Sequence, residues 1–390
     1  MKHKIFLSTF YYQPELGGIE NYLADVLRIS PRGFIVSKPY FGYESKRILC
    51  SEVEDIYCYV GFKSLIRKNK KYFKWLLPFI YINQFFSGLG VLSRRRSEIG
   101  AIYAGSGDFV IAPLVLSKLF RLPLVTFVYG NDIQQKQSIF SKIYKGKMLL
   151  YMLSLSKVVV AISHYTVSIL KRGGYRNNNI ILLNPFLSDV SIGSIKPRNM
   201  SEYERDGFVL LTIGRIVQRK GYESILYALK VVKDKGIDFK YRIVGDGPYR
   251  NEVLRIIDTL GLQSCVELLG VVDDIDPFYQ EADVFIMPSI ELPGDVEGFG
   301  IVFLEAGLRS VPVIASLSGG IPDAVVDGET GLLVTPGDVD EIADAIILLM
   351  GDAALRMRMG RAGYRRATER APILLAIDNI EARISNGVAA

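Results

Sequence analysis

Short apolar segments alternate with longer amphipathic ones along the whole chain. The apolar segments are rich in Val, Ile and Leu, and most are followed by a turn with Gly, Ser, Asn or Pro, as is typical of buried strands. Segments such as 221–236 and 338–352 have helical periodicity instead. This alternation predicts two parallel sheets with helices on both faces. The predicted strands are 4–10, 101–106, 122–130, 157–163, 180–185, 207–215, 239–247, 264–272, 282–289 and 311–316.

The length of 390 residues predicts two domains. The stretch 188–207 is rich in Ser, Pro and charge, lacks periodicity, and marks the expected boundary. We therefore expect one Rossmann-like domain over 1–190, a second over 205–370, and a C-terminal helix in 371–390 that packs back on the first. Parallel sheets bind ligands at the carboxyl ends of their strands, so the expected site lies in a cleft between the domains.

The charge is unevenly divided along the chain. Residues 1–190 hold 26 Lys and Arg against 11 Asp and Glu, whereas the other 200 residues hold 21 against 30. This asymmetry indicates different partners for the two halves. Three cysteines do not make a disulfide framework, which favours a reducing compartment, and the N-terminus has no secretory pattern.

Residues 63–96 contain nine Lys and Arg and no acidic residue, around the uncharged stretch LLPFIYINQFFSGLGVL. That stretch has 17 residues and includes Pro78, so it is short for a bilayer span of about 20 apolar residues. A basic and aromatic surface that contacts an anionic membrane fits better. The alternatives are a buried helix with a solvated basic end, or nucleic-acid binding, for which no motif is present.

Two glycine-containing turns could bring backbone close to a ligand. Gly17 and Gly18, in ELGGIENYLADVL, precede an amphipathic helix whose N-terminus offers N–H groups to an anion. Gly245 and Gly247, in VGDGP, fit a strand-to-helix turn in which a base or phosphate could lie. Each turn also has an ordinary structural explanation.

A basic cluster follows the strand in TIGRIVQRKG. Gly214 ends the strand, and Arg215 and Lys220 come next, where a diphosphate would find two positive charges at a strand end. Arg219 is expected to be solvated. The alternative is that all these side chains are surface charges.

The stretch EGFGIVFLEAG places Glu297 in a loop and Glu305 about one turn inside an apolar helix. The two carboxylates can bind different parts of one elongated ligand, for example the vicinal hydroxyls of a ribose. The N–H groups of Phe299, Gly300 and Ile301 can meet a phosphate between them. The alternative is that the inner glutamate caps its own helix and the outer one is solvated.

These motifs, in this order, resemble the retaining nucleotide-sugar glycosyltransferases of family 4. EGFGIVFLEA is similar to the family's E-x7-E signature, and GGIE, GRIVQRKG, VGDGP, ADVFIMPS, GGIPDAVVDGETGLLV and GDVDEIADAI extend the likeness over almost the whole chain. The resemblance implies an α/β chain with the GT-B fold, in which two Rossmann-like domains face each other across a deep cleft. It implies that the N-terminal domain binds the acceptor and the C-terminal domain binds the donor.

The resemblance also implies roles for single residues. Arg215 and Lys220 would hold the donor diphosphate, Glu305 would bind the ribose, and Glu297 would contact hydroxyls of the donor sugar. The Gly17–Gly18 pair would close over the diphosphate or the acceptor.

One position departs from the family pattern. Where the family often carries His, the segment TFVYGNDI has Tyr129, followed by Gly130 and Asp132. Tyr129 can donate a hydrogen bond to a sugar hydroxyl but cannot carry a positive charge. His164, after the next strand, could compensate or could be structural, and we count it with Asp132 as an acceptor or accessory residue.

The resemblance favours front-face attack, in which a donor phosphate oxygen takes the acceptor's proton. The catalytic set would be Glu297, Arg215, Lys220 and Tyr129. The acidic triplets at 274–276 and 338–340 are better explained as helix caps and first-turn acids than as metal ligands. We expect no required metal and no cofactor besides the nucleotide-sugar substrate.

The predicted protein is thus a hexosyltransferase that uses a UDP- or GDP-sugar and a glycan or lipid-linked acceptor in cell-surface polysaccharide or glycolipid assembly. It would be cytoplasmic, in peripheral contact with the membrane, without a nucleic-acid partner. The alternatives are a nucleotide-sugar-binding subunit without transfer activity, and a nucleotide-sugar epimerase.

Overall fold

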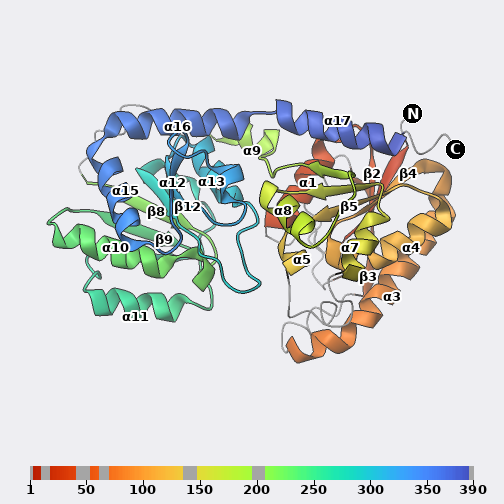
Figure 1. Cartoon of the computed structure of the whole chain (residues 1–390), viewed down its shortest axis with the longest axis horizontal. Coiled ribbons are helices and arrows are strands. Elements are labelled where there is room, and N and C mark those ends of the chain that lie inside the picture. Colours follow the sequence, from red (N-terminus) through yellow and green to blue (C-terminus); the bar gives the residue numbers. More distant parts are fainter. Residues whose placement is uncertain are drawn as a thin grey trace. The chain divides into compact units, whose positions relative to one another are not determined.

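The computed structural model of the chain describes residues 3–9, 18–40, 53–60, 70–134, 147–195 and 207–385. The chain forms two compact units, shown in Figure 1. The first comprises residues 1–185 and 371–390, and the second comprises residues 186–370. The chain therefore enters the second unit just before the predicted boundary stretch and returns to the first unit in its last helix.

The first unit is built on a seven-stranded parallel sheet in the order β3-β2-β1-β4-β5-β6-β7. Its strands are β1 (Lys4–Ser8), β2 (Phe34–Tyr40), β3 (Val53–Val60), β4 (Ile99–Ala104), β5 (Leu124–Val128), β6 (Val158–Ala161) and β7 (Ile180–Leu182). Its helices are α1 (Gly18–Ile29), α3 (Lys70–Arg95), α4 (Ile111–Phe120), α5 (Asn131–Gln134), α7 (Lys147–Ser154), α8 (His164–Arg172) and α17 (Ala371–Ser385), with 3-10 turns η1 (Arg96–Glu98) and η2 (Gly107–Phe109). The sequence pattern predicted five of these strands but not β2 and β3.

The second unit has a six-stranded parallel sheet in the order β10-β9-β8-β11-β12-β13. Its strands are β8 (Val209–Ile213), β9 (Lys240–Val244), β10 (Val266–Gly270), β11 (Val284–Met287), β12 (Val313–Ser316) and β13 (Gly331–Val334). Its helices are α9 (Asp189–Ser194), α10 (Tyr222–Asp234), α11 (Arg250–Leu260), α12 (Asp276–Glu281), α13 (Ile301–Leu308), α14 (Ile321–Ala324), α15 (Val339–Gly351) and α16 (Ala353–Thr368), with the 3-10 turn η4 (Gln218–Lys220).

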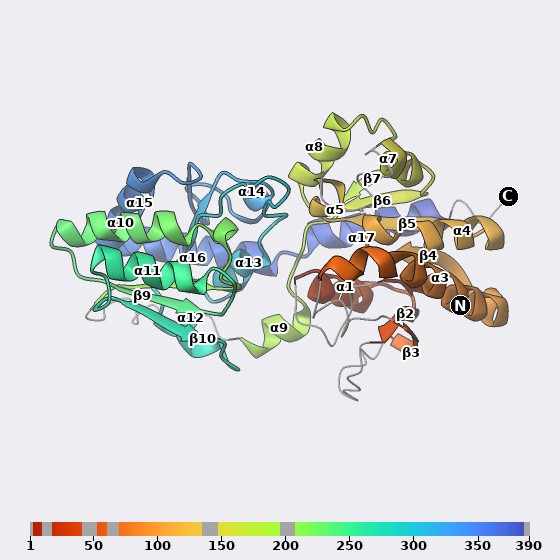
Figure 2. The same ribbon diagram turned by 90° about the horizontal axis from the view of Figure 1, so that it is seen from below.

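One face of the first sheet is covered by α3, α4 and α7. The register pairs Phe6 with Ile102 and Ile102 with Leu124, so these side chains share a face. They belong to one buried cluster with Leu92 of α3 and Met152 of α7. Figure 2 shows α3 and α4 lying side by side, in agreement with their contacts.

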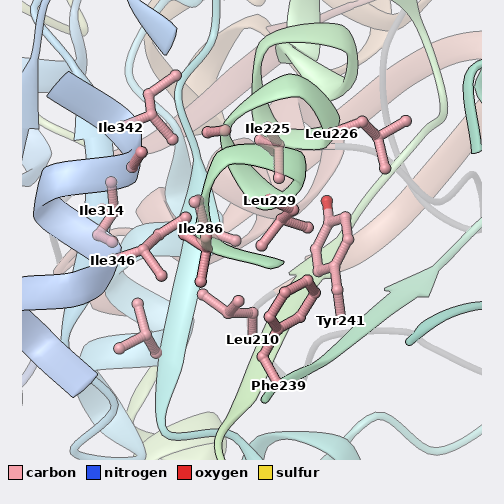
Figure 3. Packing of buried hydrophobic residues seen from close by; sticks show 14 of the residues in the cluster. Leu210, Ile225, Leu226, Leu229, Phe239, Tyr241, Ile286, Ile314, Ile342 and Ile346 are labelled. Carbon is pink, nitrogen blue, oxygen red and sulfur yellow. The ribbon is translucent and has the colours of Figure 1, made fainter. Parts of the chain in front are cut away.

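The core of the second unit lies where α10 and α15 pack against the sheet. Figure 3 shows Leu229 of α10 and Ile346 of α15 close to Ile286 of β11, all fully buried. Burying one such side chain contributes roughly 1.5–3 kcal/mol. The helical period of 221–236 and 338–352 thus positions two helices over one sheet, and the sheet in turn fixes the loops at its carboxyl edge.

Two glycines of the VGDGP turn are needed for close packing between loops. A Cβ on Gly245, whose φ is +135°, would lie 2.0 Å from the carbonyl oxygen of Gly214, and a Cβ on Gly247 would lie 2.2 Å from that of Ile216. The loops after β8 and β9 therefore pack backbone against backbone. This packing supplies a structural reason for the glycines that does not require a ligand.

Within the described residues, none of the helices combines the length and the apolar character that crossing a membrane requires.

We expect Gly245→Ala to lower the free energy of unfolding of the second unit by about 2 kcal/mol or more, because the added methyl group meets a carbonyl that cannot easily move. Gly351→Ala is the matched control, since a Cβ there meets nothing within 4 Å. Its effect should stay below about 1 kcal/mol. Urea unfolding followed by circular dichroism measures both, and equal effects would contradict the packing explanation.

Candidate active site

The predicted donor residues lie in loops at the carboxyl edge of the second sheet. Arg215 follows β8 and Lys220 ends the η4 turn, while Glu297 lies in the loop between β11 and α13. These loops contact each other directly, because the amide of Ile290 donates to the carbonyl of Arg219 at 2.8 Å. A Cβ on Gly221 would lie 2.2 Å from the carbonyl oxygen of Pro288. The fold therefore brings the basic motif and the first glutamate together.

The carboxylate of Glu297 is held by two cations. Its Oε2 atom accepts from Lys220 Nζ at 2.6 Å and from a terminal guanidinium nitrogen of Arg219 at 2.5 Å. Arg219 Nε also lies 2.8 Å from Oδ1 of Asp295. The backbone of Glu297 is fixed as well, since its carbonyl accepts from the amide of Gly320 at 2.8 Å. Both cations therefore act on one oxygen of a carboxylate that is also anchored by its backbone.

The environment of Glu297 keeps it ionised. Burial would raise the pKa of this carboxyl, but the charges of Lys220 and Arg219 and their hydrogen bonds outweigh burial and lower the pKa to about 2. The Glu297 side chain is only 13% exposed. At neutral pH this group is an anion that accepts hydrogen bonds and does not act as an acid.

The expectation that Arg219 is solvated is wrong. Its side chain is 15% exposed and lies between Glu297 and Asp295. Burial tends to lower the pKa of Arg219, and the two carboxylates more than compensate. The solvated alternative for Glu297 is wrong for the same reason, because this ion cluster encloses its side chain.

Arg215 and Glu305 have ionic groups that are free of such pairing. The structure gives neither the Arg215 guanidinium nor the Glu305 carboxylate a hydrogen bond or ion pair among the described residues, and Arg215 is exposed. Burial raises the pKa of Glu305, and the charge of Arg309 opposes this. Neither ionic group is therefore engaged by another described side chain in this state.

The helix α13 begins where the sequence predicted. Gly300 has a φ of +90° at the N-cap, and a Cβ there would lie 2.4 Å from the ring of Phe303. The first N–H groups of a helix lack intrahelical partners, so the start of α13 at Ile301 presents donors beside Phe299, whose side chain is buried. Glu305 lies in the second turn, one turn before Arg309.

The acidic triplets have structural partners. Asp276 lies in the first turn of α12 and pairs with Arg309, which also stacks over the ring of Tyr279. Asp338 caps α15 by accepting from the amide of Glu341 at 3.0 Å. Within the described ranges no group of three His, Cys, Asp or Glu side chains is arranged to hold a metal ion. That no metal is required stays a prediction.

The second predicted cluster lies at the carboxyl edge of the first sheet. Tyr129, at the end of β5, is 6% exposed, and its hydroxyl donates to the carbonyl of Gly105 at 3.0 Å. Asp132 accepts from the amides of Tyr129 and Gly107 at 3.0 and 3.2 Å. Because a phenol has one proton, Tyr129 in this state can accept a hydrogen bond from a sugar hydroxyl but cannot donate one.

Two carboxyl groups lie close together at this edge. Burial raises the pKa of Asp132 to about 6, against the hydrogen bonds from the backbone that lower it. Burial and the charge of Asp132 also raise the pKa of Asp108.

The remaining predicted residues of the first unit lie at helix starts. His164 is exposed at the start of α8, after the N-cap Ser163. Gly18 begins α1, and Gly17 lies outside the described residues.

Residues 196–366 match the family model described as glycosyl transferases group 1. The match lies within the second unit, which we call the group 1 domain after this model. The chain is 38% identical over 165 residues to a GDP-mannose-dependent alpha-(1-6)-phosphatidylinositol monomannoside mannosyltransferase of Mycolicibacterium smegmatis. It is 36% identical over 163 residues to the capsular polysaccharide biosynthesis glycosyltransferase CapM of Staphylococcus aureus. Each match covers 41% of this chain, and the chain spans less than half of each relative, 43% and 41%.

Solved structures resemble the fold of the whole chain, including the part outside the group 1 domain. The Anabaena protein Alr3699/HepE in complex with UDP has a TM-score of 0.74 at 21% identity, over 98% of this chain and all of that one. Its complex with UDP-glucose has a TM-score of 0.70 at 21% identity, over 99% of this chain and all of that one. The predicted two-domain α/β GT-B fold is confirmed.

The sequence analysis did not identify two members of the ion cluster in the group 1 domain, Arg219 and Asp295. Arg219 is adjacent to Lys220, and Asp295 lies two residues before Glu297, and both of those neighbours were identified. A signal was present in the matched charges of Arg219–Lys220 and Asp295-x-Glu297, but nothing in the chain order says that these two pairs meet.

Asp132 allows a test of its ionisation without any substrate. Its pKa is raised on folding, so the folded state keeps a proton that the unfolded state loses, and stability falls as pH rises from about 4 to about 6. We expect Asp132→Asn to remove ~1–3 kcal/mol of this pH dependence. Urea unfolding at several pH values, followed by the fluorescence of the single tryptophan, Trp75, measures it. Parallel pH profiles of wild type and variant would contradict the assignment.

Proposed function

We propose that the chain is a retaining hexosyltransferase. It transfers a sugar from a UDP- or GDP-linked donor to a hydroxyl of a glycan or lipid-linked acceptor, in the assembly of a cell-surface polysaccharide or glycolipid. The ion cluster around Glu297 is the observation that carries the proposal, because it lies at the carboxyl edge of the group 1 domain, with the unpaired groups of Arg215 in the loop after β8 and of Glu305 in α13.

The proposed donor fits the charges of this edge. A nucleoside diphosphate sugar has an anionic centre and hydroxylated groups on both sides. Arg215, Lys220 and the N–H groups at the start of α13 suit the diphosphate, Glu305 suits the ribose, and Glu297 suits the sugar hydroxyls. Oε2 of Glu297 is already engaged by two cations, so Oε1 is the oxygen that accepts from the sugar.

The chemistry asks for stabilisation of two charges. Negative charge develops on the leaving diphosphate, where Arg215, Lys220 and helix N–H groups act, and positive charge develops on the sugar ring near the Glu297 carboxylate. We propose front-face attack, in which a phosphate oxygen of the donor takes the acceptor's proton. No metal or further cofactor is part of the proposal.

The first unit would bind the acceptor at the carboxyl edge of its sheet. Tyr129 accepts from an acceptor or sugar hydroxyl, while the neighbouring Asp132 and the exposed His164 are accessory groups. Gly17 and Gly18 precede α1 and would approach the diphosphate or the acceptor. The relatives' printed names, a phosphatidylinositol monomannoside mannosyltransferase and a capsular polysaccharide enzyme, support a lipid-linked or glycan acceptor.

Contact with a membrane, at the inner face of the cell membrane, is the second part of the proposal. The helices α3, α4 and α7 contain no acidic residue and cover one face of the first sheet. Their outward side chains include large apolar groups with basic groups around them, and we name them the α3–α4–α7 surface. The exposed apolar members are Phe79, Ile82, Phe86, Val115, Leu119, Met148 and Tyr151. The exposed basic residues in these helices are Arg94, Lys118 and Lys147, and Arg96 and Arg121 directly follow α3 and α4.

The spacing within α3 supports this surface. Ile80, Gln84 and Gly88 face the protein, whereas Phe79, Ile82 and Phe86 face outward. Aromatic and aliphatic groups insert at the lipid interface, and each Lys or Arg near an anionic surface contributes about 1 kcal/mol. Residues 63–69 of the predicted basic stretch lie outside the described residues, and so do the side chains of 70–77.

Donor binding and turnover test the first part. We expect either UDP or GDP, and its glucose or mannose conjugate, to raise the melting temperature, and the conjugate to release free sugar slowly. Lys220→Met should lower that release by ~100-fold, because a charge is lost where the leaving group develops its own. Arg255→Met is the control and should act like wild type, because Arg255 forms an exposed ion pair elsewhere in the same unit.

Other results would point to the alternatives. Binding without sugar release would favour a subunit without transfer activity, and conversion of the bound sugar to another would favour an epimerase. A several-fold loss of activity with EDTA would overturn the proposal that no metal is required.

Vesicle sedimentation tests the membrane contact. We expect the whole protein to sediment with vesicles of equal parts phosphatidylglycerol and phosphatidylcholine at low salt, and not with phosphatidylcholine alone. The double variant Phe79→Ser/Phe86→Ser should bind about tenfold more weakly, because two apolar side chains no longer insert. Leu375→Ser on α17, which also removes an exposed apolar side chain, is the control. No sedimentation of the wild type at low salt would remove this part of the proposal.

A further inference from the structure

The ion cluster at the donor edge is balanced in charge. Arg219 and Lys220 supply two positive charges, and Asp295 and Glu297 supply two negative ones. Lys220 is 11% exposed on its side chain and donates to Glu297 at 2.6 Å. The cation proposed for the diphosphate is therefore already engaged by a carboxylate of the protein.

This engagement creates a competition. A diphosphate that binds Lys220 must draw it away from Glu297 or share it. If Lys220 were the sole counter-ion of Glu297, the move would leave an ionised and largely buried carboxylate without a partner, which is strongly unfavourable. A second cation on the same oxygen removes most of that cost.

We propose that Arg219 is this second cation: it neutralises Glu297 so that Lys220 can pass to the donor diphosphate. Arg219 is then a positioning residue, which acts on the nucleotide through Glu297 and Lys220 and does not touch the ligand. The inference rests on the proposed function in one respect, namely that a nucleoside diphosphate binds at this edge.

The geometry suits the task. Arg219 and Lys220 are adjacent in the η4 turn, and both reach Oε2 of Glu297, so one can leave while the other stays. Arg219 Nε also lies 2.8 Å from Asp295, a side chain that is 50% exposed, so Arg219 shares its charge between two carboxylates. Its own carbonyl accepts from the amide of Ile290, so the turn stays in place when Lys220 moves.

A double-variant cycle in nucleotide binding tests the inference. The binding of UDP and of GDP is measured by titration calorimetry for wild type, Arg219→Met, Glu297→Gln and the two changes combined. We expect Arg219→Met to weaken the nucleotide that binds by about tenfold, because Glu297 then retains Lys220. Glu297→Gln should bind at least as tightly as wild type, and the combined variant should bind like Glu297→Gln. Arg219→Lys should restore much of the binding, and Arg255→Met is again the control.

Asp295→Asn gives a second reading that does not depend on how well the first variants fold. Without Asp295, Arg219 serves Glu297 alone, so Lys220 is released more readily and nucleotide binding should be as tight as in wild type or tighter. Weaker binding in Asp295→Asn would contradict the inference.

The remaining outcomes are distinct. A combined variant as weak as Arg219→Met would mean that Arg219 contacts the phosphates itself, and wild-type affinity in Arg219→Met would mean that it has no role in binding. Either result overturns the inference and leaves the proposed function standing. A wild type that binds neither UDP nor GDP overturns both.

Discussion

The electrostatic balance around Glu297 is the constraint on which the donor edge of this protein depends. A carboxylate that is largely buried is stable only if its charge is matched, and here two cations from one turn match it. The match holds the loop before α13 against the η4 turn, and the amide of Gly320 fixes the same residue from the next loop. One residue therefore links three loops that follow different strands, through its side chain to the η4 turn and through its backbone to the loop of Gly320.

The same balance separates the ionic groups of this edge into two kinds. Glu297 and Lys220 satisfy each other in the described state, whereas Arg215 and Glu305 have no such partner within the described part of the chain. A ligand that binds Arg215 or Glu305 breaks no ion pair of the protein. A ligand that binds Lys220 or Glu297 must replace the contact between them. This is the physical reason to look for an additional cation, and Arg219 meets the requirement.

The two units differ in the charge of their residues. The helices α3, α4 and α7 carry basic and apolar groups without any acid, while the group 1 domain lies in the acidic half of the chain. A basic and apolar surface suits an anionic bilayer, and a mixed-charge edge suits a charged soluble donor. The division follows the proposed division of labour between a lipid-linked or glycan acceptor and a nucleotide-sugar.

The residue pattern along the chain predicts the sheet-and-helix alternation, most strands, the start of α13 and the motifs that point to a nucleotide-sugar. It does so because buried parallel strands and amphipathic helices leave periodic patterns in the chain. It missed β13, a strand of four residues, and also β2 and β3, in which polar residues interrupt the apolar pattern. Which charges pair depends on the folded arrangement of the loops. Arg219 and Lys220 contact Glu297 across 78 and 77 positions, and no local pattern encodes a contact over that separation. The fold likewise determines that the Tyr129 hydroxyl donates its hydrogen bond to the carbonyl of Gly105, since a side chain's partner depends on which loops the folded sheet brings together.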